Sequence, residues 1–365
     1  MTDTRKESHM AADPDSGISI RGISKSFDGT RVLRDIDLEV GRGEFFSLLG
    51  PSGCGKSTLL NILGGLETPD SGSIRIGDRD VTHLPAEKRP TNMVFQSYAM
   101  FPHLSVAKNV AYGLRRKRLG RRERDEKVER MLSLVHLDGL GDRNPSELSG
   151  GQRQRVALAR ALVMEPAVLL LDESLAALDR RLREAMQIEL RELQREVGIT
   201  FVFVTHDQDE AMSMSDRIAV MGGGRILQIG RPTELYHAPA SREVAEFIGS
   251  INLIEVTPCA GGRLEAPGLG AFDCDSAAGE GGLLALRPEC FGIAREAPAA
   301  GNRLEGRVRE VTFLGDRSYL RVNVEGLEDP LIASCSFREA EGLSRDDRVW
   351  LTWSAEDGRL IPSDR

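Results

Sequence analysis

The sequence lacks the long apolar run that a membrane-spanning helix requires. None of its hydrophobic stretches approaches the roughly 20 residues needed to cross a bilayer. Its first 16 residues are polar and lack the apolar core of a secretion signal, and we expect residues 1–17 to form a disordered tail. The chain also lacks an excess of basic residues, because its net charge is −8, and this argues against a general affinity for nucleic acid.

Cysteine is scarce, and its spacing suits neither cross-links nor metal binding. There are five cysteines, an odd number without any C-x-x-C pair, at Cys54, Cys259, Cys274, Cys290 and Cys335. This pattern argues against a disulfide framework and against structural zinc. We therefore expect reduced thiols and a cytoplasmic protein.

One glycine-rich stretch has a specific chemical meaning. The sequence Gly50-Pro51-Ser52-Gly53-Cys54-Gly55-Lys56-Ser57-Thr58, here called the phosphate loop, fits the pattern G-x-x-x-x-G-K-[ST]. It follows an apolar run at 45–49 that is typical of a buried strand, and apolar spacing after it predicts a helix over 56–66 with Leu66 on its apolar face. In such a cradle, backbone N–H groups face anionic oxygens, Lys56 reaches the β- and γ-phosphates, and Ser57 ligates Mg²⁺.

Residues 18–253 alternate apolar strands with helices. The runs 167–171 and 200–204 are almost entirely apolar, as expected for strands that are covered on both faces of a parallel sheet. Between these runs, apolar residues recur at helical spacing, namely Leu182, Met186, Leu190, Leu193 and Val197. The pattern predicts a βαβ crossover and an α/β fold.

The stretch at about 97–158 interrupts this alternation. It is mostly helical in pattern, with Val128, Met131, Leu132 and Val135 on one helix face, and we interpret it as a helical insertion in the α/β core. After residue 253, apolar and polar residues alternate instead, as at 320–324 and 349–353. We therefore interpret residues 254–365 as a small all-β, barrel-like domain.

A basic run, residues 115–122, lies within the helical stretch. It contains six Arg and Lys residues, a pattern that is compatible with binding to nucleic acid or lipid head groups. The net negative charge of the chain and the acidic residues that follow, Glu123, Asp125 and Glu126, favour a solvated surface instead.

Two acidic residues close the apolar run 167–171. A carboxylate at the carboxyl end of a parallel strand faces the crevice where open α/β sheets bind ligands. There, Asp172 can hold Mg²⁺ directly or through water, and Glu173 can polarise a water that attacks the γ-phosphate. By themselves the two residues would simply open a loop, but the phosphate loop in the same domain favours the catalytic interpretation.

Three other residues occupy informative places. His206 follows the run 200–204 and can donate to a γ-phosphate, although alone it would be a loop or helix-capping histidine. Gln96 lies where the core joins the helical insertion, so its neutral amide can contact Mg²⁺ or water, and we consider it a candidate hinge. Phe27 lies in a predicted turn, where it either stacks on a base or belongs to the core.

A second anion-binding loop precedes the predicted helix 153–162. Its sequence, Leu148-Ser149-Gly150-Gly151-Gln152, places a serine and two glycines before the positive end of a helix dipole. Because one chain has only one phosphate loop, this second loop suggests a target on another copy's nucleotide. The alternative is an ordinary helix cap.

These residues, in this order, resemble the motif set of ABC transporter ATP-binding subunits, from about residue 18 to the end of the chain. The resemblance implies a P-loop NTPase (RecA-like) core over residues 18–253 with a helical subdomain, followed by an OB-like barrel of the TOBE type over 254–365. It implies that the catalytic residues are Glu173, His206, Gln96 and Lys56. It implies that ATP contacts Phe27, the phosphate loop, Ser149, Gly150, Gly151, Gln152 and Asp179. It implies that Mg²⁺ is held by Ser57, Gln96 and Asp172.

The resemblance is greatest to spermidine/putrescine import subunits, in segments such as Asp172-Glu173-Ser174-Leu175 and 96–103. It implies a head-to-tail homodimer that sits on the inner face of the membrane with two permeases and a substrate-binding protein. Importers of iron(III), sulfate or sugar are the alternative, followed by a non-transport ABC ATPase. Ser174 replaces a proline that most ABC ATPases have, and Ala176 replaces a common serine, which puts the strength of communication between subunits in doubt.

Overall fold

The structure is a computed structural model that describes residues 16–173, 175, 179–275 and 281–363. The chain divides into two compact units, Met1–Pro232 and Thr233–Arg365. The predicted tail lies outside the described residues except for its last two, residues 16 and 17, which begin the first strand. Among the described residues, no helix combines the length and the apolar character that crossing a membrane requires.

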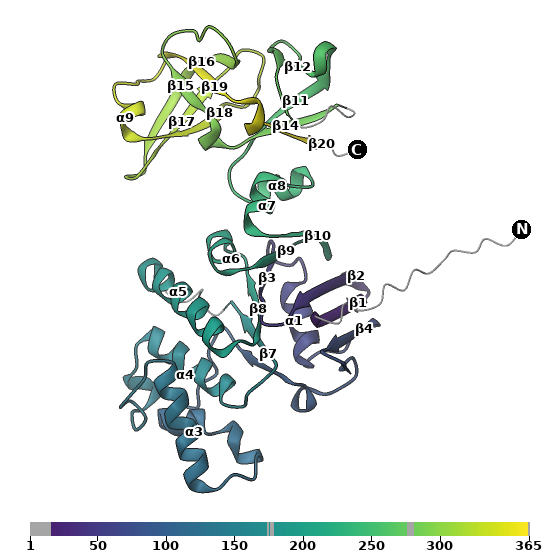
Figure 1. The fold of residues 1–365 in the computed structure, drawn as a ribbon, viewed down its shortest axis with the longest axis vertical. Coiled ribbons are helices and arrows are strands. Elements are labelled where there is room, and N and C mark those ends of the chain that lie inside the picture. The colour runs from purple at the N-terminus through teal and green to yellow at the C-terminus, as the bar shows by residue number, and fades with distance from the viewer. Residues whose placement is uncertain (1–15, 174, 176–178, 276–280, 364–365) are drawn as a thin grey trace, which may run out of the picture. The chain divides into compact units, whose positions relative to one another are not determined.

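A six-stranded sheet forms the centre of the first unit (Figure 1). Its strands lie in the order β10-β9-β3-β8-β7-β6, and all neighbours are parallel except β10 and β9. The bounds are β3 (Phe45–Leu49), β6 (Thr91–Val94), β7 (Val168–Asp172), β8 (Thr200–Thr205), β9 (Arg217–Gly222) and β10 (Arg225–Gly230). The α/β core predicted from the apolar runs is confirmed.

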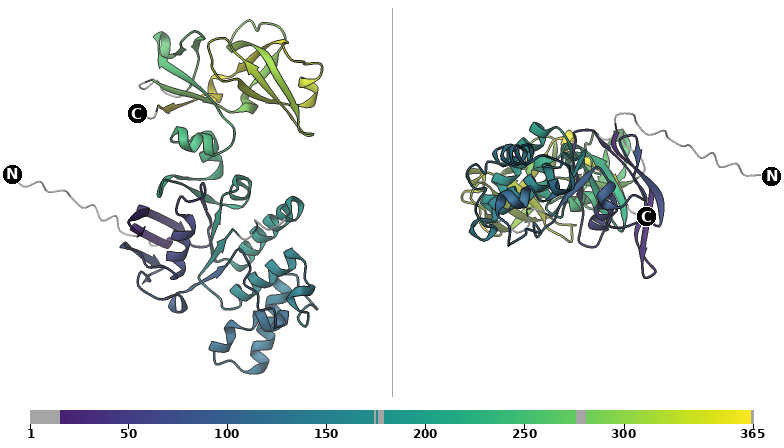
Figure 2. Two further views of the ribbon diagram at one scale, coloured as in Figure 1. Left: turned by 180° about the vertical axis from the view of Figure 1, so that it is seen from behind. Right: turned by 90° about the horizontal axis from the view of Figure 1, so that it is seen from below.

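Both faces of this sheet are buried, in two separate apolar cores. Alternate residues of β7 point to opposite sides, so Leu169 and Leu171 join one core and Val168 and Leu170 join the other. The first core packs under the helical layer, seen to one side of the sheet in Figures 1 and 2. The helices of that layer are α2 (Val106–Val110), α3 (Arg121–Leu134), α4 (Gly150–Leu162) and α5 (Arg180–Val197).

The other face of the sheet is covered by one helix and a second, antiparallel sheet. The helix is α1 (Lys56–Gly64), and the sheet has the order β2-β1-β4-β5. Its strands are β1 (Ser16–Phe27), β2 (Thr30–Gly41), β4 (Ser71–Ile76) and β5 (Arg79–Asp80). The predicted extent of α1 is wrong at its end, because Gly65 adopts a left-handed conformation (φ 74°) that stops the helix and leaves Leu66 53% exposed.

The second unit contains two five-stranded antiparallel sheets that share one apolar core. Their orders are β13-β12-β11-β14-β20 and β15-β19-β16-β17-β18. The first sheet contains β11 (Asn252–Pro258), β12 (Leu264–Ala266), β13 (Gly270–Phe272), β14 (Gly282–Leu286) and β20 (Arg359–Pro362). The second contains β15 (Gly292–Ala294), β16 (Asn302–Phe313), β17 (Ser318–Asn323), β18 (Leu331–Cys335) and β19 (Arg348–Trp353), with α9 (Phe337–Ala340) after β18.

Two short helices, α7 (Pro232–His237) and α8 (Arg242–Phe247), contact the second unit, and one buried arginine contributes several of these contacts. Arg287 is 4% exposed, and its guanidinium donates hydrogen bonds to the carbonyl oxygens of Tyr236, Ala245, Gly249 and Ser250 at 2.9–3.3 Å. It also lies 4.0 Å from the centre of the Tyr236 ring. These contacts explain why the compact unit begins earlier in the chain than the domain boundary predicted after residue 253.

Replacing Arg287 by Met is expected to destabilise the second unit by about 3 kcal/mol, because several buried carbonyls lose their donor. Both tryptophans, Trp350 and Trp353, lie in this unit, so tryptophan fluorescence reports its unfolding alone. Arg359→Met is the matched control, since Arg359 is exposed on the same side of the unit. Equal urea midpoints for the two variants would refute the role of Arg287.

Candidate nucleotide site

The carboxyl ends of four neighbouring parallel strands bring the predicted site residues to one edge of the sheet. The phosphate loop follows β3, His206 follows β8 and Glu173 follows β7. Gln96 comes two residues after β6, the next strand beside β7. Residues that are up to 156 positions apart in the sequence therefore lie along the ligand-binding edge of an open α/β sheet.

The phosphate loop is shaped to receive an anion. Gly55, with φ 105°, precedes α1, which has neither a side-chain cap nor an acidic residue in its first turn. The N-terminal N–H groups of α1 are therefore not engaged by a side-chain cap, and they can face phosphate oxygens. A Cβ at Gly50 would lie 2.3 Å from the carbonyl oxygen of Met221, so no larger residue fits there.

Lys56 places a buried positive charge inside this loop. Its side chain is 5% exposed, and its Nζ donates to the carbonyl oxygens of Gly50 at 2.7 Å and Pro51 at 3.0 Å. Ser57, the next residue, is exposed at the start of α1. The loop thus brings an ammonium and an exposed hydroxyl together at the start of α1, and these are the groups that an anion with a bound divalent cation requires.

Glu173 lies between His206 and Gln96 at this edge of the sheet. Its Oε1 is 3.1 Å from His206 Nδ1, and its Oε2 accepts a hydrogen bond of 3.4 Å from Gln96 Nε2. The backbone of Glu173 has φ 41°, a strained left-handed conformation, and its N–H donates to the Val204 carbonyl at 3.0 Å. The strain at this residue is offset by contacts that hold its carboxylate between β6 and β8.

The pKa of Asp172 is raised, first because the carboxyl is buried and second because Glu173 carries a neighbouring negative charge. The positive charge of Lys56 lowers the pKa of Asp172, so the ammonium of the phosphate loop lies close enough to stabilise the Asp172 carboxylate. A bound divalent cation would favour ionised Asp172 in the same way.

The segment that carries His206 is held by a network that the sequence analysis missed. The Thr205 hydroxyl donates to buried Glu210 at 2.5 Å, and Arg183 of α5 contacts Asp207 at 3.2 Å. Asp207, not His206, caps α6 (Gln208–Met214). The alternative that His206 is a capping residue is therefore wrong. Only the polar residues clustered after β8 hint at this network in the sequence.

Ser149 and Asp179 both cap helices. The Ser149 hydroxyl accepts a hydrogen bond from Gln152 N at 3.3 Å, and Gln152 Oε1 accepts one from Ser149 N at 2.9 Å. Within one chain, these residues therefore form an ordinary helix cap, as the alternative interpretation predicted. Asp179 accepts from Leu182 N at 3.0 Å at the start of α5. Both residues are exposed and stay candidates for contacts with another chain. Ser174 and Ala176, the two residues that differ from the usual ABC ATPase sequence, lie outside the described residues.

Phe27 ends β1 with 42% of its surface exposed, so it is not a core residue. The Lys25 ammonium lies 5.1 Å from the centre of its ring. The remaining exposed surface of the ring is compatible with the predicted stacking on a base.

A strained segment follows Gln96 and is clamped by an arginine that the sequence did not single out. Tyr98 and Ala99 have φ values of 58° and 42°, although neither is glycine. Arg160 of α4 donates to both of their carbonyl oxygens at 2.6 Å, and its guanidinium lies 5.5 Å from the centre of the Phe101 ring. Since α4 begins at Gly150, this helix joins the segment after Gln96 to the Ser149 loop.

Replacing Arg160 by Met is expected to loosen residues 97–101, because two charge-assisted hydrogen bonds are lost. We expect a loss of about 2 kcal/mol of local stability, or about 30-fold faster amide hydrogen exchange in this segment. Arg160→Lys should show an intermediate effect, because one ammonium cannot replace the two-carbonyl fork. Unchanged exchange in Arg160→Met would rule out the clamp.

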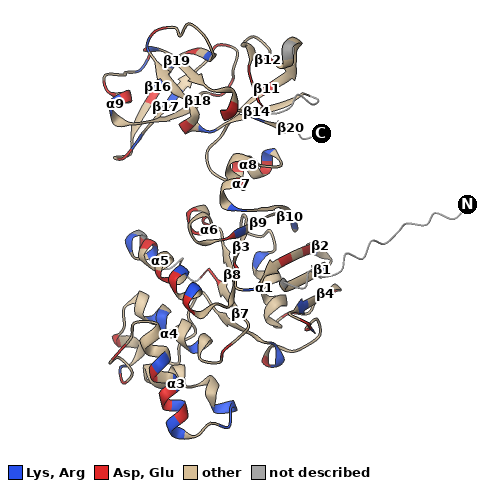
Figure 3. Ribbon diagram, in the orientation of Figure 1, with Lys and Arg blue, Asp and Glu red and all other residues tan. Residues whose placement is uncertain are grey.

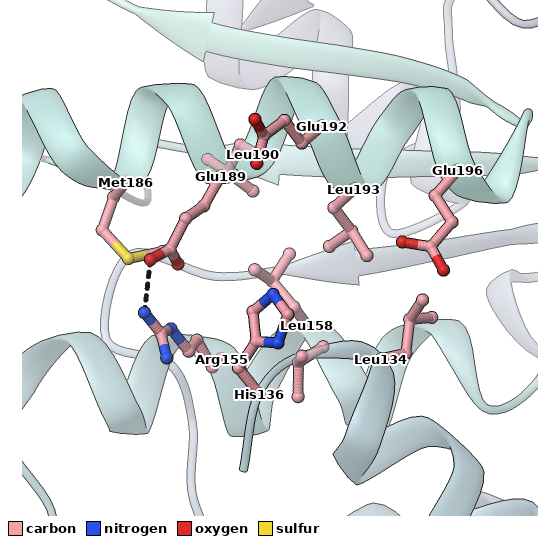
Figure 4. A pocket seen from close by; sticks show the side chains of 11 residues that line it. Leu134, His136, Arg155, Leu158, Met186, Glu189, Leu190, Glu192, Leu193 and Glu196 are labelled. Carbon is pink, nitrogen blue, oxygen red and sulfur yellow. Dashed lines mark hydrogen bonds and ion pairs between the residues drawn. The ribbon is translucent and has the colours of Figure 1, made fainter.

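Two further hollows differ in what they can hold. The cavity between α4 and α5 in Figure 4 is about 70 Å³ and is bridged by the Arg155–Glu189 ion pair. It is too small for a nucleotide, since ligand pockets usually have several hundred Å³. The other hollow, here called the insertion groove, has about 690 Å³ and is lined by Phe95, Phe101, Tyr112 and Arg160, among others.

Comparison with known proteins agrees with the fold. The ABC transporter family matches residues 33–176, and the TOBE domain matches residues 284–361. Two solved structures each resemble about 60% of the chain. One is cbiO1 of Clostridium perfringens (TM-score 0.57, 33% identity, 60% of this chain and 90% of that one). The other is a dimeric, post-hydrolysis ATP-binding cassette, MJ0796, bound to ADP and Pi (TM-score 0.53, 31% identity, 59% and 98%).

The fold and the site therefore define an ABC-type P-loop NTPase with a TOBE domain. Curated relatives narrow the assignment. The spermidine/putrescine import ATP-binding protein PotA of Thermobifida fusca (strain YX) is 46% identical over 94% of this chain and 93% of its own length. PotA of Pseudomonas aeruginosa (strain UCBPP-PA14) is 45% identical over 94% and 98%. The chain belongs to this family of import ATP-binding proteins.

Proposed function

We propose that this protein is the ATP-hydrolysing subunit of an importer for polyamines such as spermidine and putrescine. The observation that carries the ATPase assignment is the Glu173 carboxylate, 3.1 Å from His206 at the same sheet edge as the phosphate loop. The support for polyamines is the near full-length similarity to relatives that bear that name.

In this proposal the chain's residues position a water against the γ-phosphate of ATP. Glu173 orients that water and accepts its proton, while His206 donates to the γ-phosphate oxygen. Lys56 leaves the carbonyls of its own loop to offset the charge that develops on the phosphoryl oxygens. Phe27 stacks on the base.

Mg²⁺ fits the donor set of this edge. When bound, it would neutralise phosphate charge and polarise the reacting group. Ser57, Asp172 and Gln96 would hold it, directly or through water. Among the described residues, no three His, Cys, Asp or Glu side chains gather as a metal site. An ion held mainly by substrate phosphates and one carboxylate is the usual arrangement for Mg²⁺.

The active form in this proposal is a head-to-tail homodimer. Each ATP lies in the phosphate loop of one chain and is covered by the Ser149–Gln152 turn of the other, with Asp179 near the seam. The exposure of Ser149 and Asp179 supports this arrangement, as does the similarity to a dimeric cassette bound to ADP and Pi.

Permease subunits would dock in the insertion groove. Phe95 and Tyr112 are large apolar side chains that are 39% and 42% exposed there, which is typical of a protein-binding surface. The groove is linked to the catalytic residues in two ways. Phe95 of the groove precedes Gln96, which contacts Glu173, and Arg160 of the groove belongs to α4, which begins after Ser149. Movement of a permease in the groove would thus reach both Glu173 and the Ser149 turn.

The solute is tested by uptake, since no residue of this subunit contacts it in the transport path. A deletion strain should lose uptake of labelled spermidine or putrescine and regain it with the intact gene, but not with Glu173→Gln. Labelled iron(III), sulfate and maltose serve as parallel assays. Normal polyamine uptake in the deletion strain, with loss of one of the other solutes, would reject the polyamine assignment.

A further inference from the structure

The basic run 115–122, here called the basic loop, lies on the surface and extends from the last two residues of the helical turn Gly113–Arg116 to the first two residues of α3. Figure 3 shows its blue segments at the end of the helical layer. The side chains of Arg121 and Arg122 are 90% and 93% exposed, and Arg115, Arg116 and Arg118 are exposed as well. The loop therefore presents a dense positive surface on a chain whose net charge is −8.

The acidic residues that follow do not neutralise this surface. Asp125 and Glu126 pair with Arg121 at 3.8 Å and Arg122 at 2.8 Å, on an exposed helix face where such pairs are weak. Arg118 has no ion-pair partner among the residues that the structure describes. The charges remain available to a larger anionic surface.

The loop also adjoins the insertion groove. Tyr112, Gly113 and Arg116 line that groove, and Arg115 lies 5.1 Å from the centre of the Tyr112 ring. If an integral membrane permease occupies the groove, as proposed above, the adjoining loop is brought close to the membrane surface. The inner surface of bacterial membranes attracts clusters of Arg and Lys through its anionic lipids.

We propose that the basic loop binds the anionic lipid head groups of the membrane that holds the permease. This inference rests on the proposed function for its geometry, but it concerns a different partner. Nucleic acid is less well supported, because single-strand binding combines charge with several stacking aromatics. The basic loop itself contains no aromatic residue, and the Tyr112 ring that Arg115 contacts also packs on Phe101 at 4.3 Å.

The test uses the full chain with vesicles that contain neither permease nor ATP. At low salt, the protein should sediment with phosphatidylcholine vesicles that contain about one-third phosphatidylglycerol, and not with pure phosphatidylcholine. The triple variant Arg118→Ser/Arg121→Ser/Arg122→Ser should bind about 100-fold more weakly, since each basic residue near such a surface contributes about fivefold. High salt should abolish binding.

The matched control, Arg303→Ser/Arg307→Ser/Arg309→Ser, removes the same charge from exposed positions of β16 and should bind as the parent does. Equal binding by the loop variant and the parent, or no binding to anionic vesicles, overturns the proposal. Displacement by single-stranded RNA without vesicle binding would assign the loop to nucleic acid and overturn it as well. Because the assay needs no transport, a failure here leaves the uptake test of the importer untouched.

Discussion

Glu173→Gln is expected to slow ATP hydrolysis by about 10²- to 10⁴-fold, the usual contribution of a positioned general base. The substitution keeps the shape of the side chain and its contact with Gln96, but it removes the group that accepts a proton. ATP binding should be retained, because the phosphate loop and Lys56 are unchanged. The two effects are separated by phosphate release at saturating ATP and by titration with a fluorescent ATP analogue.

The control for this variant is Glu192→Gln, which removes an equal charge from the exposed side of α5, away from the sheet edge. It should hydrolyse ATP at the parent rate. If Glu173→Gln also keeps the parent rate, Glu173 is not the base, and the geometry around His206 has another purpose. Loss of ATP binding in Glu173→Gln would show instead that the residue supports the nucleotide pocket.

Ser149→Arg is expected to abolish the ATP-dependent dimer. The long arginine side chain would fill the space at the start of α4 where the partner's phosphates are proposed to lie, and it would also remove the serine that caps this helix. In the Glu173→Gln background, which keeps ATP bound, the parent should elute from a sizing column as a dimer when ATP is present. The added Ser149→Arg change should convert it to a monomer, and Ser149→Arg in the otherwise intact protein should lower uptake to background.

Loss of the helix cap alone must be separated from this effect, because removing a serine N-cap costs about 1 kcal/mol. Ser336→Arg provides the comparison. Ser336 caps α9 with the same kind of capping box, closed by Glu339, and is exposed. The Ser336→Arg variant should lose a similar helix cap and still form the ATP-dependent dimer. A normal ATP-dependent dimer in the Ser149→Arg variant would disprove the composite site.

Much of the fold was predictable because each element carries a local signal. The apolar runs that became β7 and β8 are long enough for strands and are covered on both faces, so nearly every position is apolar. The apolar spacing over 182–197 predicted α5, whose residues Met186 and Leu190 are buried. The end of α1 was missed because Leu66 continues the helical spacing, while Gly65 stops the helix through its left-handed backbone.

The site was predictable to a different extent. The phosphate loop has a specific sequence pattern, and the carboxylates after β7 were placed by the rule that ligands bind at the carboxyl ends of parallel strands. The Arg160 clamp and the Thr205–Glu210 contact were not predicted, since their partners come from distant segments. Neither arginine nor threonine carries a sequence signal for such pairings, because both are usually solvated.

By itself the sequence determined the elements, the phosphate loop and the identity of the acidic, amide and imidazole groups that follow the strands, because these depend on local spacing and side-chain chemistry. Only the tertiary structure decided the strand order β3-β8-β7-β6, which places Glu173 between His206 and Gln96. The reason is physical: strand order and backbone strain at Glu173 arise from packing between segments far apart in the chain, and no short stretch of residues encodes them.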